Sequence, residues 1–477
     1  MKLSRAVINP QVVSAKYAVR GALAQRAEQI KDDLARDPKS HKFPEVTFLN
    51  IGNPQQLDQK PLTFVRQVLS LVQYPQLIEA RVPLFPRDAL DRAKFLLKNL
   101  GSVGAYSHSK GIHVVRESVA RFIEERDGFP SDPENIFLSA GASSAAEKIM
   151  TLVATDDNVG IMVPVPQYPL YSATSSLVGT NFQGYYLDEE HGWATSVEAI
   201  KKSYDEARAA GVLPRLLVVI NPGNPTGAVL TETQIGEILA FAKEKGVIVL
   251  ADEVYQANIF HDMAPPFTSF KKVRSLLAEQ DPAYNNVPLV SLHSTSKGFF
   301  GECGQRGGYM EVVGCPEDVM EELYKLASIE LCPVVTGQIT TEIMVNPPKL
   351  GDPSYDLYHR ESNGILNTLH ARAEQLYNAF KDMDGVTCQR PRGAMYLFPQ
   401  ITVPPKAQEA AKESGVSPDA FYAMALLNET GICVVPGSGF GQRKHTLHFR
   451  TTFLAPGGQD LSDRFVKFHN EFMKKYS

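Results

Sequence analysis

The sequence predicts an α/β fold, with a mostly parallel central sheet in a large domain and a smaller α+β domain after it. From about residue 90 to 345, helical patterns alternate with short apolar segments: IFLSA, VGIMVP, FQGYYL, RLLVVI, VIVLAD, PLVSLHS and GYMEVVG. This alternation is typical of parallel α/β domains. After NPPKLGDPSYD comes a long helical pattern, ESNGILNTLHARAEQLYNAFKDM, followed by three separated strand candidates: GAMYLFP, GICVVPG and TLHFRTTF.

These changes of pattern divide the chain into three regions. We expect residues 91–345 to form the large domain and residues 346–477 to form the small domain. Residues 1–90 are expected to pack with the small domain. Within them, AKYAVRGALAQRAEQIKDDLARD has the spacing of an amphipathic helix.

Composition excludes several classes of protein. The 477 residues are 43% hydrophobic and 21% charged, with a net charge of -5, so there is no basic field for nucleic acid. No apolar segment approaches the roughly 18 residues that a membrane span needs. The five cysteines are odd in number and never paired as C-x-x-C, which argues against a disulfide framework and against a metal site. Small polar metabolites remain as the expected partners.

The N-terminal residues bear on the cellular compartment. Residues 1–27 contain basic side chains and no acidic one, a bias that mitochondrial transit peptides share. The helical pattern described above leaves about the first 14 residues for targeting. We therefore expect a cytoplasmic protein and regard the mitochondrial matrix as the alternative.

Four polar residues follow apolar segments of the large domain. Lys297 stands in VSLHSTSKGFF among small hydroxyl residues, Asn224 in VINPGNPTG, and Asp252 and Tyr255 in VIVLADEVYQ. Alone, each has a plain explanation: a solvated lysine, a turn residue or a helix cap. In an open parallel sheet, however, ligands bind at the carboxyl ends of the strands. The four together predict a pocket for pyridoxal phosphate (PLP), whose aldehyde can bond to Lys297.

Transamination explains why these residue types are needed. Asp252 is suited to keep the pyridine nitrogen protonated, because a nearby opposite charge favours the ionised form. Tyr255 and Asn224 can donate hydrogen bonds to the phenolic oxygen of the ring. Lys297 can carry the proton from the substrate Cα to the cofactor carbon.

The cofactor phosphate needs anion donors, and LSAGASSAAEKIM has the pattern of a strand, a small-residue turn and a helix start. Backbone N–H groups near Gly141, Ala142 and Ser143 can bind an anion there, although plain helix capping is the alternative. Further donors are expected from three side chains: Ser294, Ser296 and Arg306.

Three more residues are candidates for ring and substrate contacts. Tyr168 in VPVPQYPLYS is placed to stack on the ring, although ordinary packing is the alternative. Arg450 in TLHFRTTF can bind the substrate α-carboxylate as a fork, whereas strand periodicity alone would make it a solvent-facing residue. The backbone of Gly52 can approach the same carboxylate closely because glycine lacks a Cβ.

At these residues the chain resembles the fold type I PLP-dependent aminotransferases (class I), and within them the alanine aminotransferase subfamily, over nearly its whole length. The resemblance rests on YAVRG, NIGNPQQ, GAYSHSKG, RDGFP, GASSAA, PQYPLY, VINPGNPTG, DEVYQ, SKGFFGECGQRGGYM, VVTGQ, GAMYLFP, GICVVPGSGFGQ and HFRTTFLAP. It implies transfer of the amino group of L-alanine to 2-oxoglutarate, giving pyruvate and L-glutamate by a ping-pong mechanism. Glutamate:glyoxylate aminotransferase and a PLP-binding homologue without turnover remain the alternatives.

The resemblance also implies roles for the residues named above and a homodimer, in which Tyr106 reaches the phosphate of the neighbouring subunit. One residue more than in aspartate-type relatives separates Lys297 from Arg306, which resembles the GECG insertion of alanine-type members. Lys110 stands where such members are expected to carry glutamine. Arg20 in YAVRG is the candidate for the distal carboxylate of 2-oxoglutarate.

Overall fold

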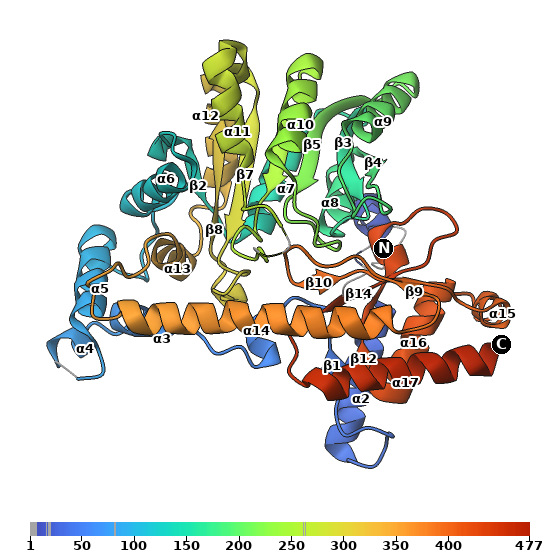
Figure 1. Cartoon of the computed structure of the whole chain (residues 1–477). Helices are drawn as coiled ribbons and strands as arrows, with labels where there is room; N and C mark the ends of the chain where they lie inside the picture. Colours follow the sequence, from blue (N-terminus) through green and yellow to red (C-terminus); the bar gives the residue numbers. More distant parts are fainter. Residues whose placement is uncertain (1–6, 16, 18–20, 81–82, 261, 263) are drawn as a thin grey trace.

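The structure of the chain is a computed structural model that describes residues 7–477, except 16, 18–20, 81–82, 261 and 263. A large domain built on one sheet stands above a smaller domain, and a long helix runs between them (Figure 1). Among the described residues, no helix is both long and apolar enough to cross a membrane.

The central sheet of the large domain has seven strands in the order β2-β8-β7-β6-β5-β3-β4. β8 runs antiparallel to the other six strands. All seven strand segments expected from the sequence lie in this sheet, so the predicted fold class is confirmed. The strands are β2 (Ile136–Leu138), β3 (Val159–Val165), β4 (Asn181–Tyr186), β5 (Leu213–Ile220), β6 (Ile248–Asp252), β7 (Leu289–Ser294) and β8 (Gly308–Val313).

Helices cover both faces of this sheet, which explains why its central strands are apolar throughout. Along β5, Leu216 and Val218 pack on one face, whereas Leu217 and Val219 pack on the other. The first face is covered by α7 (Ala142–Val153), α8 (Leu170–Val178) and α12 (Glu317–Ile329). The second is covered by α9 (Val197–Ala209), α10 (Glu232–Lys245) and α11 (Phe270–Gln280).

Helix α14 (Tyr355–Lys381) runs below the large domain and leads into the small one (Figure 1). The small domain has short strand pairs in place of one wide sheet, with β14 between β10 and β13, and β9 beside β11. Its elements are β9 (Val386–Thr387), β10 (Tyr396–Leu397), β11 (Gln400–Ile401), α15 (Pro405–Glu413), α16 (Pro418–Thr430), β12 (Ile432–Cys433), β13 (Val435–Pro436), η7 (Gly437–Phe440), β14 (Phe449–Thr452) and α17 (Gly458–Tyr476).

The first hundred residues pack in more than one place, although the sequence led us to expect residues 1–90 to join the small domain as one segment. Helix α2 (Ala22–Arg36) and β1 (Thr47–Phe48) do pack there, and β1 pairs with β12. In contrast, α1 (Pro10–Ser14) lies against α8 of the large domain. The helix expected over residues 15–37 starts only at Ala22, after Gly21, a residue that disfavours a helix interior.

A second departure concerns the helices that follow β1. Apolar side chains of α3 and α5 pack against α13 and the beginning of α14, away from the core of the small domain. The boundaries at residues 90 and 345 stay predictions. The remaining elements are η3 (Pro54–Leu57), α3 (Thr63–Gln73), α4 (Gln76–Glu79), α5 (Arg87–Leu100), α6 (His113–Asp127), η4 (Pro133–Asn135), η5 (Pro282–Asn286), η6 (Cys303–Gln305) and α13 (Val335–Val345).

Glu253, which follows β6, is a carboxyl group buried beside the sheet. It is 1% exposed and accepts a hydrogen bond of 2.8 Å from the backbone N–H of Phe270. Burial raises the pKa of Glu253 to about 8, although the nearby Arg126 opposes the rise. Its contribution to stability is therefore fully present below the ordinary pKa of 4.5 and is lost as the pH rises through 8.

We expect Glu253→Gln to make thermal stability less sensitive to alkaline pH, because glutamine keeps an oxygen acceptor for Phe270 and cannot ionise. The melting temperature of the wild type should fall more steeply than that of the variant between about pH 4.5 and about pH 8. Scanning calorimetry across this range measures the difference. Glu279→Gln, at an exposed position of α11, is the matched control and should follow the wild type. If the melting temperatures of all three proteins change with pH in parallel, the prediction is wrong.

Candidate active site

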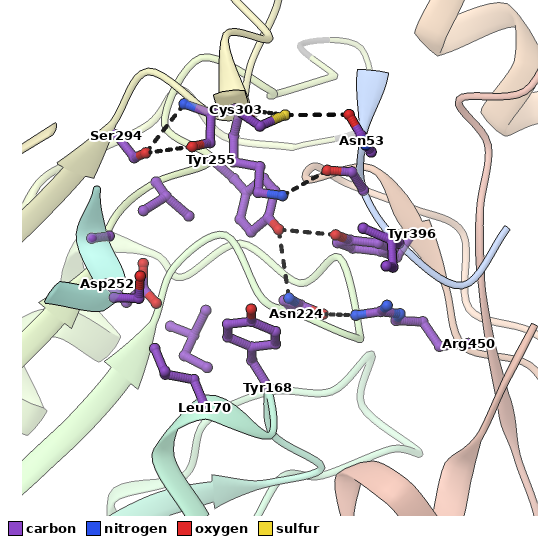
Figure 2. Close-up of a pocket in the computed structure, with 18 of the residues that line it drawn as sticks. Asn53, Tyr168, Leu170, Asn224, Asp252, Tyr255, Ser294, Cys303, Tyr396 and Arg450 are labelled. Atoms are coloured by element: carbon purple, nitrogen blue, oxygen red, sulfur yellow. Dashed lines mark hydrogen bonds between the residues drawn. The ribbon is translucent and has the colours of Figure 1, made fainter. Parts of the chain in front are cut away.

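A cavity of about 320 Å³ lies where the carboxyl ends of the central strands meet the small domain. It brings together side chains that are far apart in the sequence, and Figure 2 shows Asp252 at one end of the view and Arg450 at the other. Its lining includes twelve residues singled out from the sequence: Gly52, Ala142, Ser143, Tyr168, Asn224, Asp252, Tyr255, Ser294, Ser296, Lys297, Arg306 and Arg450.

Lys297 lies in the loop after β7, and its Nζ donates a hydrogen bond of 2.8 Å to the carbonyl oxygen of Gly52. The backbone at Gly52 is close to the small domain, because a Cβ there would stand 2.2 Å from Tyr396 Oη. Glycine is therefore required at this position. The lysine amine thus reaches the joint between the two domains.

The loop after Lys297 is held by α3 and the η3 segment. Arg66 on α3 forms an ion pair of 3.0 Å with the buried carboxylate of Glu302. The same guanidinium donates to Gln55 Oε1 at 3.0 Å, while Gln55 Nε2 donates to the carbonyl of Gly301 at 3.1 Å. These contacts fix the two segments that carry Lys297 and Gly52, the partners in the hydrogen bond described above.

Asp252 ends β6 and is 5% exposed. Its Oδ2 accepts a hydrogen bond of 2.7 Å from Tyr171, whereas its Oδ1 is buried and has no hydrogen-bond partner among the described residues. Burial raises the pKa of Asp252, and the Tyr171 hydrogen bond opposes the rise. A buried oxygen without a donor is costly. The protonated pyridine nitrogen of PLP is a donor of the type that this oxygen lacks.

Asn224 and Tyr255 belong to a chain of hydrogen bonds that crosses the cavity. Asn224 Nδ2 donates to Tyr255 Oη at 3.5 Å, and Tyr255 Oη donates to Tyr396 Oη at 3.3 Å (Figure 2). Burial raises the pKa of Tyr255 well above its ordinary value. Burial also acts to raise the pKa of Tyr396, but the positive charges of Lys297 and Arg450 outweigh it and the pKa is lowered. The chain therefore offers polar hydrogens beside the lysine.

The expected phosphate donors lie around the start of α7. Gly141 precedes the helix with φ +86°, and a Cβ there would stand 2.5 Å from Arg306 Nη2. Arg306 Nη1 lies 3.5 Å from Ser296 Oγ, and Ser294 Oγ lies 3.0 Å from the same hydroxyl. A helix N-terminus, a guanidinium and two hydroxyls form a cradle suited to a phosphate.

Arg450, on β14, is 1% exposed and faces the cavity, so the solvent-facing alternative is wrong. Its guanidinium lies between two aromatic rings, 4.2 Å from the centre of Tyr396 and 4.7 Å from that of Phe440. Nη1 donates to Asn224 Oδ1 at 3.0 Å and Nη2 to the carbonyl of Asn50. Among the described residues, Nε has no hydrogen-bond partner and the guanidinium has no carboxylate within 4.0 Å. The group is suited to bind an external carboxylate.

Sequence reasoning missed several residues of this site. Tyr396 contributes a ring and a hydroxyl, and Tyr171 orients Asp252. Tyr17, before α2, has its hydroxyl 2.7 Å from that of Tyr168. Cys303 lines the cavity wall with Sγ 3.5 Å from the carbonyl of Ser296. Tyrosines of this kind carry no sequence signal beyond an apolar pattern, whereas Cys303 lies within the GECG segment already singled out.

Three residues named from the sequence lie away from the cavity of this chain or beyond the description. Tyr106 is 79% exposed and is not part of the lining. Lys110 Nζ forms an ion pair of 3.2 Å with Glu134, so its charge is compensated locally. Arg20 lies outside the described residues.

The residues present fit PLP. The free oxygen of Asp252 matches the ring nitrogen, and the cradle at Gly141 and Arg306 matches the phosphate. Lys297 lies in the same cavity and supplies an amine for the aldehyde.

Comparisons with known proteins agree with this geometry. The family model described as aminotransferase class I and II matches residues 45–468. A Saccharomyces cerevisiae protein named inactive alanine aminotransferase is 49% identical, covering 100% of this chain and 95% of the relative. The mitochondrial alanine aminotransferase of the same yeast is 50% identical over 98% of this chain and 80% of the relative. Glutamate–glyoxylate aminotransferase 1 of Arabidopsis thaliana is 48% identical, over 98% and 96%.

Solved structures show the same fold. The alanine aminotransferase from Pyrococcus furiosus superposes with a TM-score of 0.76 at 24% identity, covering 97% of this chain and 100% of that one. Because the family model spans most of the sequence and relatives about half identical cover nearly all of it, the chain belongs to the class I and II aminotransferases.

Proposed function

We propose that this chain is an alanine aminotransferase, which transfers the amino group of L-alanine to 2-oxoglutarate and releases pyruvate and L-glutamate. One observation carries the proposal. A single cavity holds Lys297, the free carboxylate oxygen of Asp252 and the buried guanidinium of Arg450. An amine, a ring-nitrogen partner and a carboxylate fork are the groups that transamination of an α-amino acid needs.

When bound, PLP supplies an electron sink that acidifies the substrate Cα. Asp252 supports this by holding a positive charge at the ring nitrogen, because its buried carboxylate favours a cation beside Oδ1. With PLP bound, Lys297 Nζ would be the base that accepts the proton from the substrate Cα and would supply it for the second proton transfer. The carbonyl of Gly52 lies 2.8 Å from this nitrogen and orients it between transfers.

Arg450 and its neighbours orient the substrate. The two aromatic rings hold the guanidinium in one plane, and its fork can donate two parallel hydrogen bonds to the α-carboxylate. Asn224 links the fork to Tyr255, so substrate binding and the hydrogen bonds of the phenolic oxygen are coupled.

Two alternatives stem from relatives. The Arabidopsis protein named glutamate–glyoxylate aminotransferase makes glyoxylate a competing acceptor, and the yeast protein named inactive makes a chain without turnover the other alternative. The presence of Lys297, Asp252 and Arg450 in one cavity favours turnover. No cationic side chain besides Lys297, Arg306 and Arg450 lines the described cavity, so the distal carboxylate of 2-oxoglutarate is assigned to Arg20 as a proposal.

We further propose that the chain forms a homodimer in the cytoplasm. Tyr106 lies in a segment beside residues 324–331, because His108 stacks on Tyr324 at 5.5 Å and Ser109 Oγ donates to the Leu331 carbonyl. Exposed apolar side chains there, including Ile329 at 74%, support an interface through which Tyr106 reaches the partner's phosphate. Contacts of α1 with α8 support a folded role for Pro10–Ser14. Imaging the full chain in cells tests the cytoplasm against the mitochondrial alternative.

The first test is turnover. The purified protein with PLP should form pyruvate from alanine faster with 2-oxoglutarate than with glyoxylate, and Lys297→Ala should lose essentially all of this activity because no amine replaces Nζ. A coupled assay for pyruvate measures both. Lys201→Ala, at an exposed position of α9, should behave as the wild type. The proposal fails if wild type makes no pyruvate with either acceptor, or if Lys297→Ala retains the wild-type rate.

The second test concerns the carboxylate fork. Arg450→Lys should raise the apparent KM for alanine about tenfold or more, because a point charge cannot form two parallel hydrogen bonds. Steady-state kinetics measure the change, and circular dichroism checks that the variant is folded. Unchanged kinetic constants in a folded variant would place the carboxylate site elsewhere.

A further inference from the structure

A row of aromatic side chains extends from the Arg450 guanidinium to the imidazole of His448. Phe440, which lies 4.7 Å below the guanidinium, meets the ring of Phe398 edge to face at 5.8 Å. Phe398 in turn stacks on the imidazole of His448, with ring centres 4.7 Å apart and planes within 2°. A displacement of His448 would therefore shift the aromatic rings that hold Arg450.

His448 is held by hydrogen bonds on both sides of its ring. Nε2 lies 2.8 Å from Glu189 Oε1, and Nδ1 lies 2.9 Å from Gln442 Oε1. Gln442 is oriented with its oxygen toward the imidazole because its Nε2 donates to Asp419 Oδ2 at 3.3 Å. Both ring nitrogens thus lie within hydrogen-bond distance of side-chain oxygens, so the imidazole is held from two sides.

This pair joins the two domains. Glu189 follows β4 in the large domain, whereas His448 directly precedes β14 of the small domain. His448 and Arg450 are two residues apart and lie on the same side of the strand. The His448 side chain is 1% exposed and that of Glu189 is 20% exposed, so water screens their interaction only in part. The strand that presents the fork is therefore tied to the edge of the sheet.

We propose that Glu189 and His448 are positioning residues for substrate binding: their hydrogen-bonded contact fixes β14 on the large domain and so sets the place of Arg450 in the cavity that holds Lys297. Neither residue lines the cavity or touches substrate. The proposal rests on the function proposed above, because it gives Arg450 the substrate α-carboxylate. The proposed role makes the affinity for alanine depend on the contact between Glu189 and His448, which lies outside the cavity.

The experiment compares two ligands of the PLP-loaded enzyme. 2-Methylalanine carries a carboxylate and has no Cα proton to lose, and isopropylamine is the same amine without the carboxylate. Absorbance changes of the bound cofactor give a dissociation constant for each. Glu189→Ala should raise the constant for 2-methylalanine about tenfold, the loss expected when a buried polar group loses its hydrogen-bond partner, and leave that for isopropylamine unchanged. Glu189→Gln, which keeps an acceptor oxygen, should give a smaller rise.

A double-mutant cycle with Arg450→Lys identifies the route of the effect. If Glu189 acts through Arg450, the loss from Glu189→Ala should largely disappear in the Arg450→Lys background. In alanine turnover, Glu189→Ala should raise the apparent KM and leave kcat within about twofold. The control is Glu190→Gln, a neighbouring exposed carboxylate, which should match the wild type.

Two outcomes would overturn the positioning role: additive losses in the cycle, or an equal loss of affinity for both ligands. Failure of the proposed function looks different. In that case the wild type itself makes no pyruvate from alanine and Arg450→Lys leaves 2-methylalanine binding unchanged.

Discussion

The structure depends on charged groups buried at the joint of two domains without their full set of partners. Asp252 keeps a carboxylate oxygen free, and Arg450 keeps Nε free with no carboxylate nearby among the described residues. A buried charge without compensation costs several kcal/mol, on the order of 3–5 when a partner is removed. The surrounding framework must therefore supply the stability that this site gives up. Ligands that carry a pyridinium and a carboxylate recover the missing interactions, which makes the same groups selective for them.

The site is divided between the central sheet, which is rigid, and the small domain, whose aromatic rings surround Arg450. Central strands with apolar side chains on both faces end at Asp252 and just before Asn224 and Lys297. Their positions follow from parallel pairing, since β5, β6 and β7 are neighbours in the sheet. Arg450 instead comes from a strand of four residues, and aromatic rings hold it in place.

The site residues at the ends of the sheet strands can be predicted well from the sequence, whereas those of the small domain can be predicted only poorly. Lys297, Asp252 and Asn224 follow long apolar segments, and parallel strands bring their carboxyl ends to one edge regardless of the loops between them. Tyr396 and Tyr17 were missed because a tyrosine in a short strand or an irregular segment looks like ordinary packing. The contact of Glu189 with His448 joins residues 259 positions apart; Glu189 stands in no motif, and the motif HFRTTFLAP that contains His448 gives no signal for its partner. The sequence did not show that the first hundred residues are divided between two domains, for a similar reason. Helix periodicity shows where an apolar face lies but not which element covers it.

A site divided in this way ties activity to the contacts that hold the two domains against each other. An aminotransferase needs Lys297 and Arg450 at a fixed separation, and in this chain that separation is set by contacts between domains: Lys297 with Gly52, Arg450 with Asn224, and His448 with Glu189. Because reacting groups misplaced by about 1 Å can lose about a hundredfold in rate, small changes in these contacts weigh as much as loss of a catalytic side chain. A chain that has every group that touches the cofactor can therefore still lose turnover when these contacts change. For such proteins the residues that fix the two domains against each other are the place to compare first.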